Sequence, residues 1–232
     1  MANRYLMAVD AGTGSVRAVL FNEDGAQLSC VQREWTHAED PRYPGSMDFD
    51  WVHNWELASE CIRGAIAQAG VDAGDIAAVS TTCMREGIVL YDEAGEEIWA
   101  CANVDARSDD EVGQLIRMNP ELEKEIYRES GQTYALGALP RILWVKNKLP
   151  ELYARVKTVS MFNDWLIYKL TGVLKTEPSN GCTTGIFDLQ KRRWDASIMR
   201  KVGLKDDIFP PVAECGEVVS RCLLYTSPSP RD

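Results

Sequence analysis

The sequence predicts an α/β fold in which an antiparallel β-meander leads a mixed sheet. Three observations favour this fold: strand patterns fill residues 5–35, a helical period covers residues 50–69, and helical patterns recur between residues 109 and 148. Strands that come first, with helices following them, are typical of an α/β domain. At 232 residues the chain is long enough for one large domain or two small ones.

The meander is expected from three short strands joined by tight turns. Residues 5–10 predict a buried strand that ends on an acid, and residues 16–21 predict a second strand after a glycine-rich turn. The segment "NEDG" at residues 22–25 is a hairpin signal, and residues 27–35 alternate as a third strand would. Three antiparallel strands are therefore expected at the front of the protein.

The remaining elements are predicted from periodicity and from the turn residues between them. Residues 50–69 have the helical period, with Trp55, Ala58, Cys61, Ile62, Ala65 and Ile66 on one face. Residues 76–82 predict a buried strand, and residues 87–91 with the following "DEAGEEIWA" predict another hairpin. Further helices are expected at residues 109–118, 120–130, 138–148, 163–170 and 196–202, and further strands at 158–161 and within "IFDLQKRRWD".

Composition excludes several classes of function. The formal net charge of −10 argues against nucleic acid or an anionic membrane surface as a partner. No run approaches the roughly 18 apolar residues of a membrane span, and the N-terminus has no signal-peptide core, so we expect a cytoplasmic protein. The seven cysteines form no CxxC pair, and with only two histidines a zinc site is not expected.

The glycine-rich segment "DAGTGSVR" at residues 10–17 is a candidate phosphate-binding loop. It lacks the lysine of a Walker loop, and a predicted strand rather than a helix follows it, which excludes a Rossmann loop. A β-hairpin turn whose backbone N–H groups and hydroxyls face a phosphate fits the pattern. The alternative, a tight hairpin with a chance acid, explains the glycines but not the ordered Asp, Thr and Ser.

Each residue of the segment has an expected role. Gly12 and Gly14 let the backbone approach a ligand, and the hydroxyls of Thr13 and Ser15 can donate to phosphate oxygens. Asp10 would hold a hydrated Mg²⁺ through water. Arg17 is either a counter-charge for the phosphates or half of a structural ion pair.

At this loop the chain resembles the actin/hexokinase-type ATPases, and specifically the FGGY carbohydrate kinases, over residues 5–219. Four further segments carry the resemblance: "MREG" at 84–87, "NVDAR" at 103–107, "NDWL" at 163–166 and "EPSNGCTTGIFDL" at 177–189. The third resembles the family's pocket-closing segment, and the second matches its Trp-x-Asp-x-Arg element with Asn103 in place of Trp. The resemblance implies an actin-like, ribonuclease H-like ATPase domain: a mixed sheet with an antiparallel meander and helices on both faces.

The resemblance also implies the substrate-binding residues. Arg85 and Glu86 would grip a polyol, since a guanidinium donates hydrogen bonds to hydroxyls and a carboxylate accepts them; the alternative is a surface ion pair. Asn103 would line the same pocket. Asp105 and Arg107 either support it or form an ordinary salt bridge. Asp164 is placed in the pocket by the resemblance, although its position before an apolar helix suits a helix cap.

Within the family, "PGSMDFD", "MREGIVLY", "IWACANVDAR" and "EPSNGCTTG" are most similar to the autoinducer-2 kinases. That likeness implies ATP- and Mg²⁺-dependent phosphorylation of a primary hydroxyl of 4,5-dihydroxy-2,3-pentanedione. A homodimer is expected for the full-length enzyme. A pentulose or glycerol kinase, or a ligand-binding protein that keeps the fold, is the alternative.

Several parts of such a kinase are expected beyond these residues. No Gly-Gly-Gly-Asp-like element, which carries the family's catalytic aspartate, occurs in the sequence, so no catalytic residue is assigned within it. We expect residues 1–219 to form the N-terminal domain of a longer kinase whose C-terminal ATP-binding domain is absent. Residues 220–232 are expected to be a non-native or disordered tail, and the fragment to be catalytically inactive.

Overall fold

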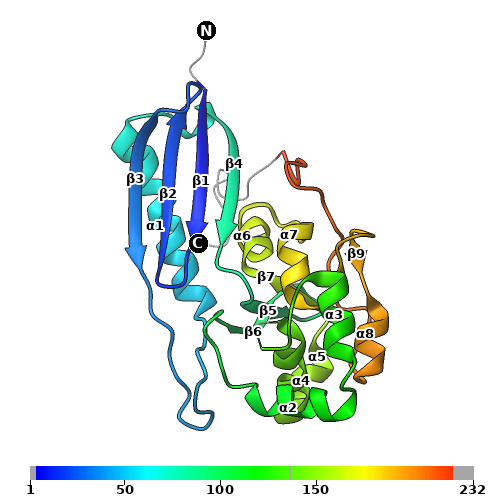
Figure 1. Cartoon of the computed structure of the whole chain (residues 1–232). Coiled ribbons are helices and arrows are strands. Elements are labelled where there is room, and N and C mark those ends of the chain that lie inside the picture. Colours follow the sequence, from blue (N-terminus) through cyan, green and yellow to red (C-terminus); the bar gives the residue numbers. More distant parts are fainter. Residues whose placement is uncertain (1–3, 136, 222–232) are drawn as a thin grey trace.

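A four-stranded mixed sheet carries the first part of the chain in the computed structural model, which describes residues 4–135 and 137–221. Strands β1 (Tyr5–Ala11), β2 (Ser15–Asn22) and β3 (Gln27–Glu34) form the antiparallel meander, and β4 (Ile76–Cys83) lies parallel to β1. The strand order is β3-β2-β1-β4 (Figure 1). The predicted meander and the mixed sheet are therefore confirmed.

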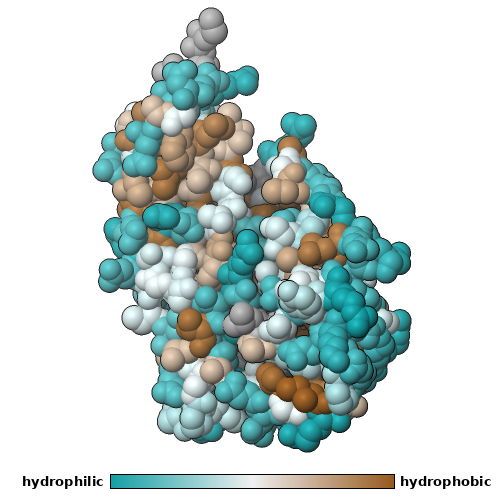
Figure 2. Space-filling view, in the orientation of Figure 1, coloured by the Kyte–Doolittle hydropathy of each residue, from teal (hydrophilic) through white to brown (hydrophobic). Residues whose placement is uncertain are grey.

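Helix α1 (Trp51–Ala69) covers one face of this sheet. Four residues of the predicted apolar face, Ala58, Cys61, Ile62 and Ala65, are buried and pack with the inward side chains of β1 and β2, while the predicted Trp55 and Ile66 are partly buried. The polar residues Asn54 and Ser59 of this helix are buried as well. The carboxylate of Asp50 accepts a hydrogen bond from the His53 amide at 3.0 Å and caps the helix, and Gly70 ends it with φ +66°. On the opposite face Leu6 and Leu28 are 43% and 42% exposed, and apolar atoms show over these strands in Figure 2.

A second, three-stranded sheet lies beneath the first in Figure 1. It consists of β5 (Ile88–Tyr91), β6 (Glu97–Cys101) and β7 (Thr158–Met161) in the order β6-β5-β7, with both pairings antiparallel. Strand β5 is buried on both sides, because its alternate side chains enter two different apolar cores. The two cores thus meet across this strand.

Helices cover the second sheet on both faces. Helix α6 (Phe162–Thr171) packs with Val89 and Tyr91 in the core that it shares with the four-stranded sheet. Helix α4 (Ala138–Lys148) packs on the other face with Ile88 and Leu90. The three-stranded sheet therefore has helices on both faces, as expected. On the four-stranded sheet, the described helices that pack against it, α1 and α6, lie on the same face and belong to one core.

The remaining helices surround α4: α2 (Asp109–Met118), α3 (Leu122–Ser130), α5 (Pro150–Arg155) and α8 (Ala196–Lys201). The short elements α7 (Pro178–Gly181), β8 (Phe187–Asp188) and β9 (Arg193–Trp194), and the 3₁₀ turns at Ala73–Asp75 and Cys182–Thr184, complete the fold. Helices α5 and α7 are too short for periodicity to reveal them. From residue 222 on, the predicted tail lies outside the described residues.

No helix among the described residues is long and apolar enough to span a membrane. The two sheets are joined where β4 leaves the first and β5 enters the second. There the Met84 amide donates to the Ala11 carbonyl at 2.7 Å, so the carboxyl ends of β1 and β4 stay side by side. Ligands of α/β proteins bind at such ends, and residues 10–15, Arg85 and Glu86 of the predicted site lie there.

Candidate functional site

The turn between β1 and β2, residues 12–14, is fixed by its carbonyl groups. The indole nitrogen of Trp35 donates to the carbonyls of Gly12 at 3.0 Å and Thr13 at 3.1 Å, and His37 Nε2 donates to Thr13 at 2.7 Å. The Trp35 amide donates to Gly14 at 3.1 Å. Trp35 is itself buried against the Phe49 ring, with 5.4 Å between the ring centroids. The turn is therefore anchored to the apolar core.

The amide N–H groups of this turn are free. Thr13 and Gly14 are exposed, and among residues 4–135 and 137–221 no acceptor takes a hydrogen bond from either amide. Neither Gly12 nor Gly14 has the positive φ that favours glycine, and a Cβ on Gly14 would meet no atom within 4 Å. The chain's own packing therefore does not require these glycines, whereas a ligand against the amides would.

Asp10 and Arg17 face each other across β1 and β2. They are register partners, and Arg17 Nε and Nη2 donate to Asp10 Oδ2 at 2.9 and 2.6 Å. Of the two interpretations of Arg17, the structure shows the ion pair. Asp10 keeps 27% of its side chain exposed, and the half-buried Ser15 begins β2 next to the turn.

Arg85 and Glu86 lie just after β4, at the same edge of the sheet. Arg85 is exposed and Glu86 is half-buried, and neither side chain has a hydrogen-bonding or ion-pair partner among the described residues. The surface ion pair considered from the sequence is therefore not formed between them. Burial raises the pKa of the Glu86 carboxyl, against the charges of Arg141 and Arg85.

Asn103, in the segment after β6, contacts the turn between β1 and β2. Its Nδ2 donates to Thr13 Oγ1 at 3.1 Å, although 90 residues separate them in the chain. Its Oδ1 is buried and has no partner among the described residues. The segment at residues 103–107 thus contacts the candidate phosphate-binding turn directly, through the asparagine that stands in place of tryptophan.

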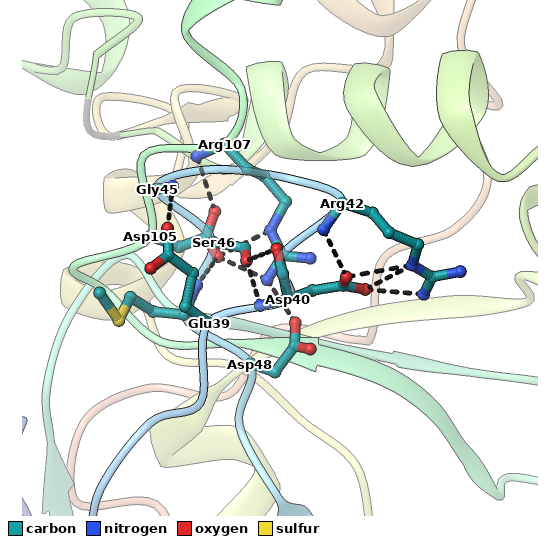
Figure 3. Close-up of polar contacts among 9 residues, drawn as sticks. Glu39, Asp40, Arg42, Gly45, Ser46, Asp48, Asp105 and Arg107 are labelled. Carbon is teal, nitrogen blue, oxygen red and sulfur yellow. Dashed lines mark hydrogen bonds and ion pairs between the residues drawn. The ribbon is translucent and has the colours of Figure 1, made fainter.

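Asp105 and Arg107 belong to the polar cluster of Figure 3, together with Glu39, Asp40, Ser46 and Asp48. The Asp105 carboxylate accepts from the Met47 amide at 2.6 Å and from Arg107 Nε at 2.7 Å, and Arg107 also pairs with Asp48. The Arg107 guanidinium lies 5.1 Å and 5.0 Å from the ring centroids of Trp99 and Trp144. The geometry favours the salt-bridge interpretation, in which the pair holds the loop at residues 39–48 in place.

Asp164 is buried in the core, at 1% exposure. Its Oδ2 accepts from the Met161 amide at 3.1 Å, at the N-terminus of α6, and burial raises its pKa to about 8. This geometry favours the helix-cap interpretation over contact with a substrate.

One residue of this site was missed from the sequence. Arg141 of α4, 2% exposed, donates to the carbonyls of Glu86, Asn103 (2.8 Å) and Asp105 (3.1 Å). The signal was an arginine inside the apolar run "ALPRILWV", where a buried cation needs acceptors.

Among the described residues, no three or more His, Cys, Asp or Glu side chains come together in a group that could hold a metal ion. Mg²⁺ is commonly held by one or two carboxylates together with phosphate oxygens, and Asp10 beside the free amides fits that role.

The sequence is similar to those of curated kinases. The sequence is 51% identical over 219 residues to an autoinducer-2 kinase of Salmonella paratyphi B, covering 94% of this chain and 41% of the relative. An Escherichia coli autoinducer-2 kinase is 50% identical over 216 residues, again with 41% of its length covered. The chain thus spans about two fifths of the curated relatives that it matches.

The fold matches solved sugar kinases. A ligand-bound xylulose kinase from Lactobacillus acidophilus superimposes with a TM-score of 0.85 at 22% identity, covering 95% of this chain and 44% of that one. This likeness confirms the predicted α/β, actin-like fold. The sequence model of the N-terminal domain of the FGGY carbohydrate kinases matches residues 5–228, past the predicted boundary at residue 219. The chain therefore belongs to the FGGY family of carbohydrate kinases, by its N-terminal domain.

Proposed function

We propose that this chain is the substrate-binding and phosphate-hairpin domain of an ATP-dependent kinase that phosphorylates a primary hydroxyl of 4,5-dihydroxy-2,3-pentanedione, the autoinducer-2 precursor. The observation that carries the proposal is the hydrogen bond from Asn103 Nδ2 to Thr13 Oγ1 at 3.1 Å. It joins a turn with free amides to the segment beside Arg85 and Glu86. A kinase must hold the phosphate and the hydroxyl together in this way.

The unpaired state of Arg85 and Glu86 supports a polyhydroxy substrate. The guanidinium offers a planar set of N–H donors, and the carboxylate accepts from hydroxyls, so the pair can fix both the position and the orientation of a small polyol or hydroxyketone. A surface ion pair would already have used these groups. The sequence identity to the autoinducer-2 kinases favours the hydroxydiketone among such substrates.

The free amides of Thr13 and Gly14 support phosphate binding. In phosphoryl transfer the substrate oxygen attacks the terminal phosphorus, ADP leaves, and the hydroxyl proton passes to a base. Amide donors on the turn would stabilise the charge of the phosphate oxygens during transfer. Asp10 would hold Mg²⁺ through water, and the ion would neutralise phosphate charge.

The base and the adenine pocket are assigned to a part of the enzyme outside these residues. Asp105 and Asp164 are buried with internal partners, so neither suits the role of base. The larger part of each curated relative lies outside the match, which supports a second lobe. We also propose a cytoplasmic enzyme, where ATP is available, and keep the full-length homodimer as part of the proposal.

Binding to the chain itself tests the substrate site. We expect 4,5-dihydroxy-2,3-pentanedione to shift the amide resonances of Arg85, Glu86 and Asn103, and to bind more tightly than xylulose or glycerol. Arg85→Ala removes charged donors and should weaken binding by about 10- to 100-fold, because hydrogen bonds to charged groups contribute about 1.5–3 kcal/mol. Asp10→Ala should bind the substrate normally, and in the enzyme that contains this domain it should abolish turnover.

Arg128→Ala, an exposed arginine of α3, is the matched control and should bind as the wild type does. If xylulose or glycerol shifts these resonances and the hydroxydiketone does not, the substrate is wrong and the sugar site stands. If no hydroxylated compound shifts them, the site itself is wrong.

A further inference from the structure

The backbone at Glu86 adopts a rare conformation. Its φ is +65°, in the left-handed region that side chains other than glycine seldom enter, and the Gly87 amide donates back to the Arg85 carbonyl at 2.8 Å. A hydrogen bond from residue i+2 to residue i around a positive φ marks a γ-turn of the strained kind. Strained residues persist where the surrounding structure over-determines them, and they cluster at functional sites.

Both ends of this turn are fixed. Before it, the Met84 amide is bonded to Ala11 of β1. After it, Gly87 lies against α6, where a Cβ would come within 2.2 Å of the Phe162 ring and 3.0 Å of the Cys101 carbonyl. The turn is therefore held at both ends, and the Glu86 carbonyl faces Arg141 of α4.

Arg141 receives that carbonyl. Its side chain is almost fully buried, and its Nη1 donates to the Glu86 carbonyl while its Nη2 donates to the carbonyls of Asn103 and Asp105. One planar guanidinium thus joins the turn after β4 to the segment after β6. Because the fork is rigid, it also sets the spacing between the two segments.

We propose that Arg141 is a positioning residue of the sugar site: it holds Glu86 in its strained turn and sets the distance from Glu86 to Asn103, and through Asn103 to the phosphate hairpin. The inference rests on the proposed function for its ligand, and its structural part stands on contacts alone. Arg141 touches no substrate. It acts through the backbone of residues that do.

The test compares three variants of the chain. Arg141→Met removes the fork and keeps the length of the side chain, and Arg141→Lys keeps the charge without the fork. Lys146→Met is the matched control, because Lys146 lies on the same helix and also donates to a carbonyl, that of Gly203 at 2.6 Å, away from the site. Backbone chemical shifts of Glu86 and Gly87 report φ, and titration with 4,5-dihydroxy-2,3-pentanedione reports the affinity.

In Arg141→Met we expect the Glu86 shifts to leave the left-handed range while resonances of the β1–β3 meander stay in place. Binding should weaken by about 10- to 100-fold, the loss expected when a hydrogen bond between the ligand and a charged side chain is no longer formed. The affinity of Arg141→Lys should lie between those of the wild type and Arg141→Met. Lys146→Met should match the wild type.

Unchanged Glu86 shifts in Arg141→Met, or wild-type affinity in that variant, would overturn the proposal. If Arg141→Met does not fold, the Arg141→Lys variant decides by the same two measurements. If the wild-type chain binds no hydroxylated ligand, the proposed function fails, and the Glu86 shifts still decide whether Arg141 holds the turn.

Discussion

Replacing Gly14 with alanine separates the needs of the fold from those of a ligand. Gly14 lies at the tip of the β1–β2 turn, has no positive φ, and would place a Cβ where no atom of the chain lies within 4 Å. Its amide is exposed and has no acceptor among the described residues. Gly14→Ala should therefore leave the fold intact and obstruct only what approaches the amide.

Gly14→Ala should change folding stability and phosphate affinity in opposite directions. Where alanine can adopt the native backbone, replacing glycine stabilises a protein by about 0.4–1 kcal/mol, because the unfolded chain has fewer conformations to lose. For a chain of this size that corresponds to a rise in Tm of roughly 1–4 °C. Loss of a hydrogen bond to a charged phosphate oxygen costs about 1.5–3 kcal/mol, or about 10- to 100-fold in affinity.

The assay pairs urea denaturation with a titration by Mg·ATP or pyrophosphate, followed at the Thr13 amide. Gly25→Ala is the matched control, because Gly25 lies at the other end of β2 with φ +81° and no atom near its Cβ. At that positive φ, the backbone of an alanine is strained even though its side chain has room. Gly25→Ala should therefore lose stability by about 1 kcal/mol and keep its phosphate affinity.

The two glycine variants thus make opposite predictions. Wild-type phosphate affinity in Gly14→Ala, with stability unchanged, would show that no phosphate approaches this turn. Loss of stability in Gly14→Ala would show that the turn needs its glycine for folding. Either result refutes the reasoning.

Two further predictions concern buried charges. Arg107→Met leaves the Asp105 carboxylate buried without its cation and should lower the free energy of unfolding by about 3–5 kcal/mol in urea denaturation. The control Arg42→Met removes the cation of the ion pair with Asp40, in which Arg42 is exposed, and should change the free energy of unfolding little. Equal losses in the two variants would contradict this. Burial raises the pKa of Asp164 from 3.8 to about 8, so between these values the folded chain holds a proton that the unfolded chain has lost. The free energy of unfolding should therefore fall as pH rises from 4 to 8, by up to about 1.4 kcal/mol per pH unit, and Asp164→Asn should abolish the fall. Parallel wild-type and variant curves would contradict this.

The local parts of the fold could be predicted because their signals are local. The meander was expected from two apolar runs and the "NEDG" turn, and α1 from its helical period. The division of the strands into two sheets could not be predicted, because it depends on where β4 releases the chain to β5 and on pairing with β7, about 70 residues later. No local pattern encodes that partner.

The candidate site divides in the same way. Asp10, Thr13, Arg85 and Glu86 were found as short motifs after strands, and the structure brings them to one edge. Asp105, Arg107 and Asp164 also lie in short motifs, at residues 103–107 and 163–166, and their burial and partners favour structural roles. Arg141 lies in no motif, because its acceptors are carbonyls of segments 38 and 55 residues away.

The pairing of polar groups is a physical criterion for separating binding residues from supporting ones. A polar group that the fold uses for itself is satisfied internally, since a buried unpaired group costs about 1–3 kcal/mol. Asp105, Arg107 and Arg141 meet that description. The amides of Thr13 and Gly14 and the side chains of Arg85 and Glu86 have no partner among the described residues. They lie on a frame fixed by Trp35, Asn103 and Arg141, so a ligand would find its donors and acceptors already in position, and binding would not have to order them.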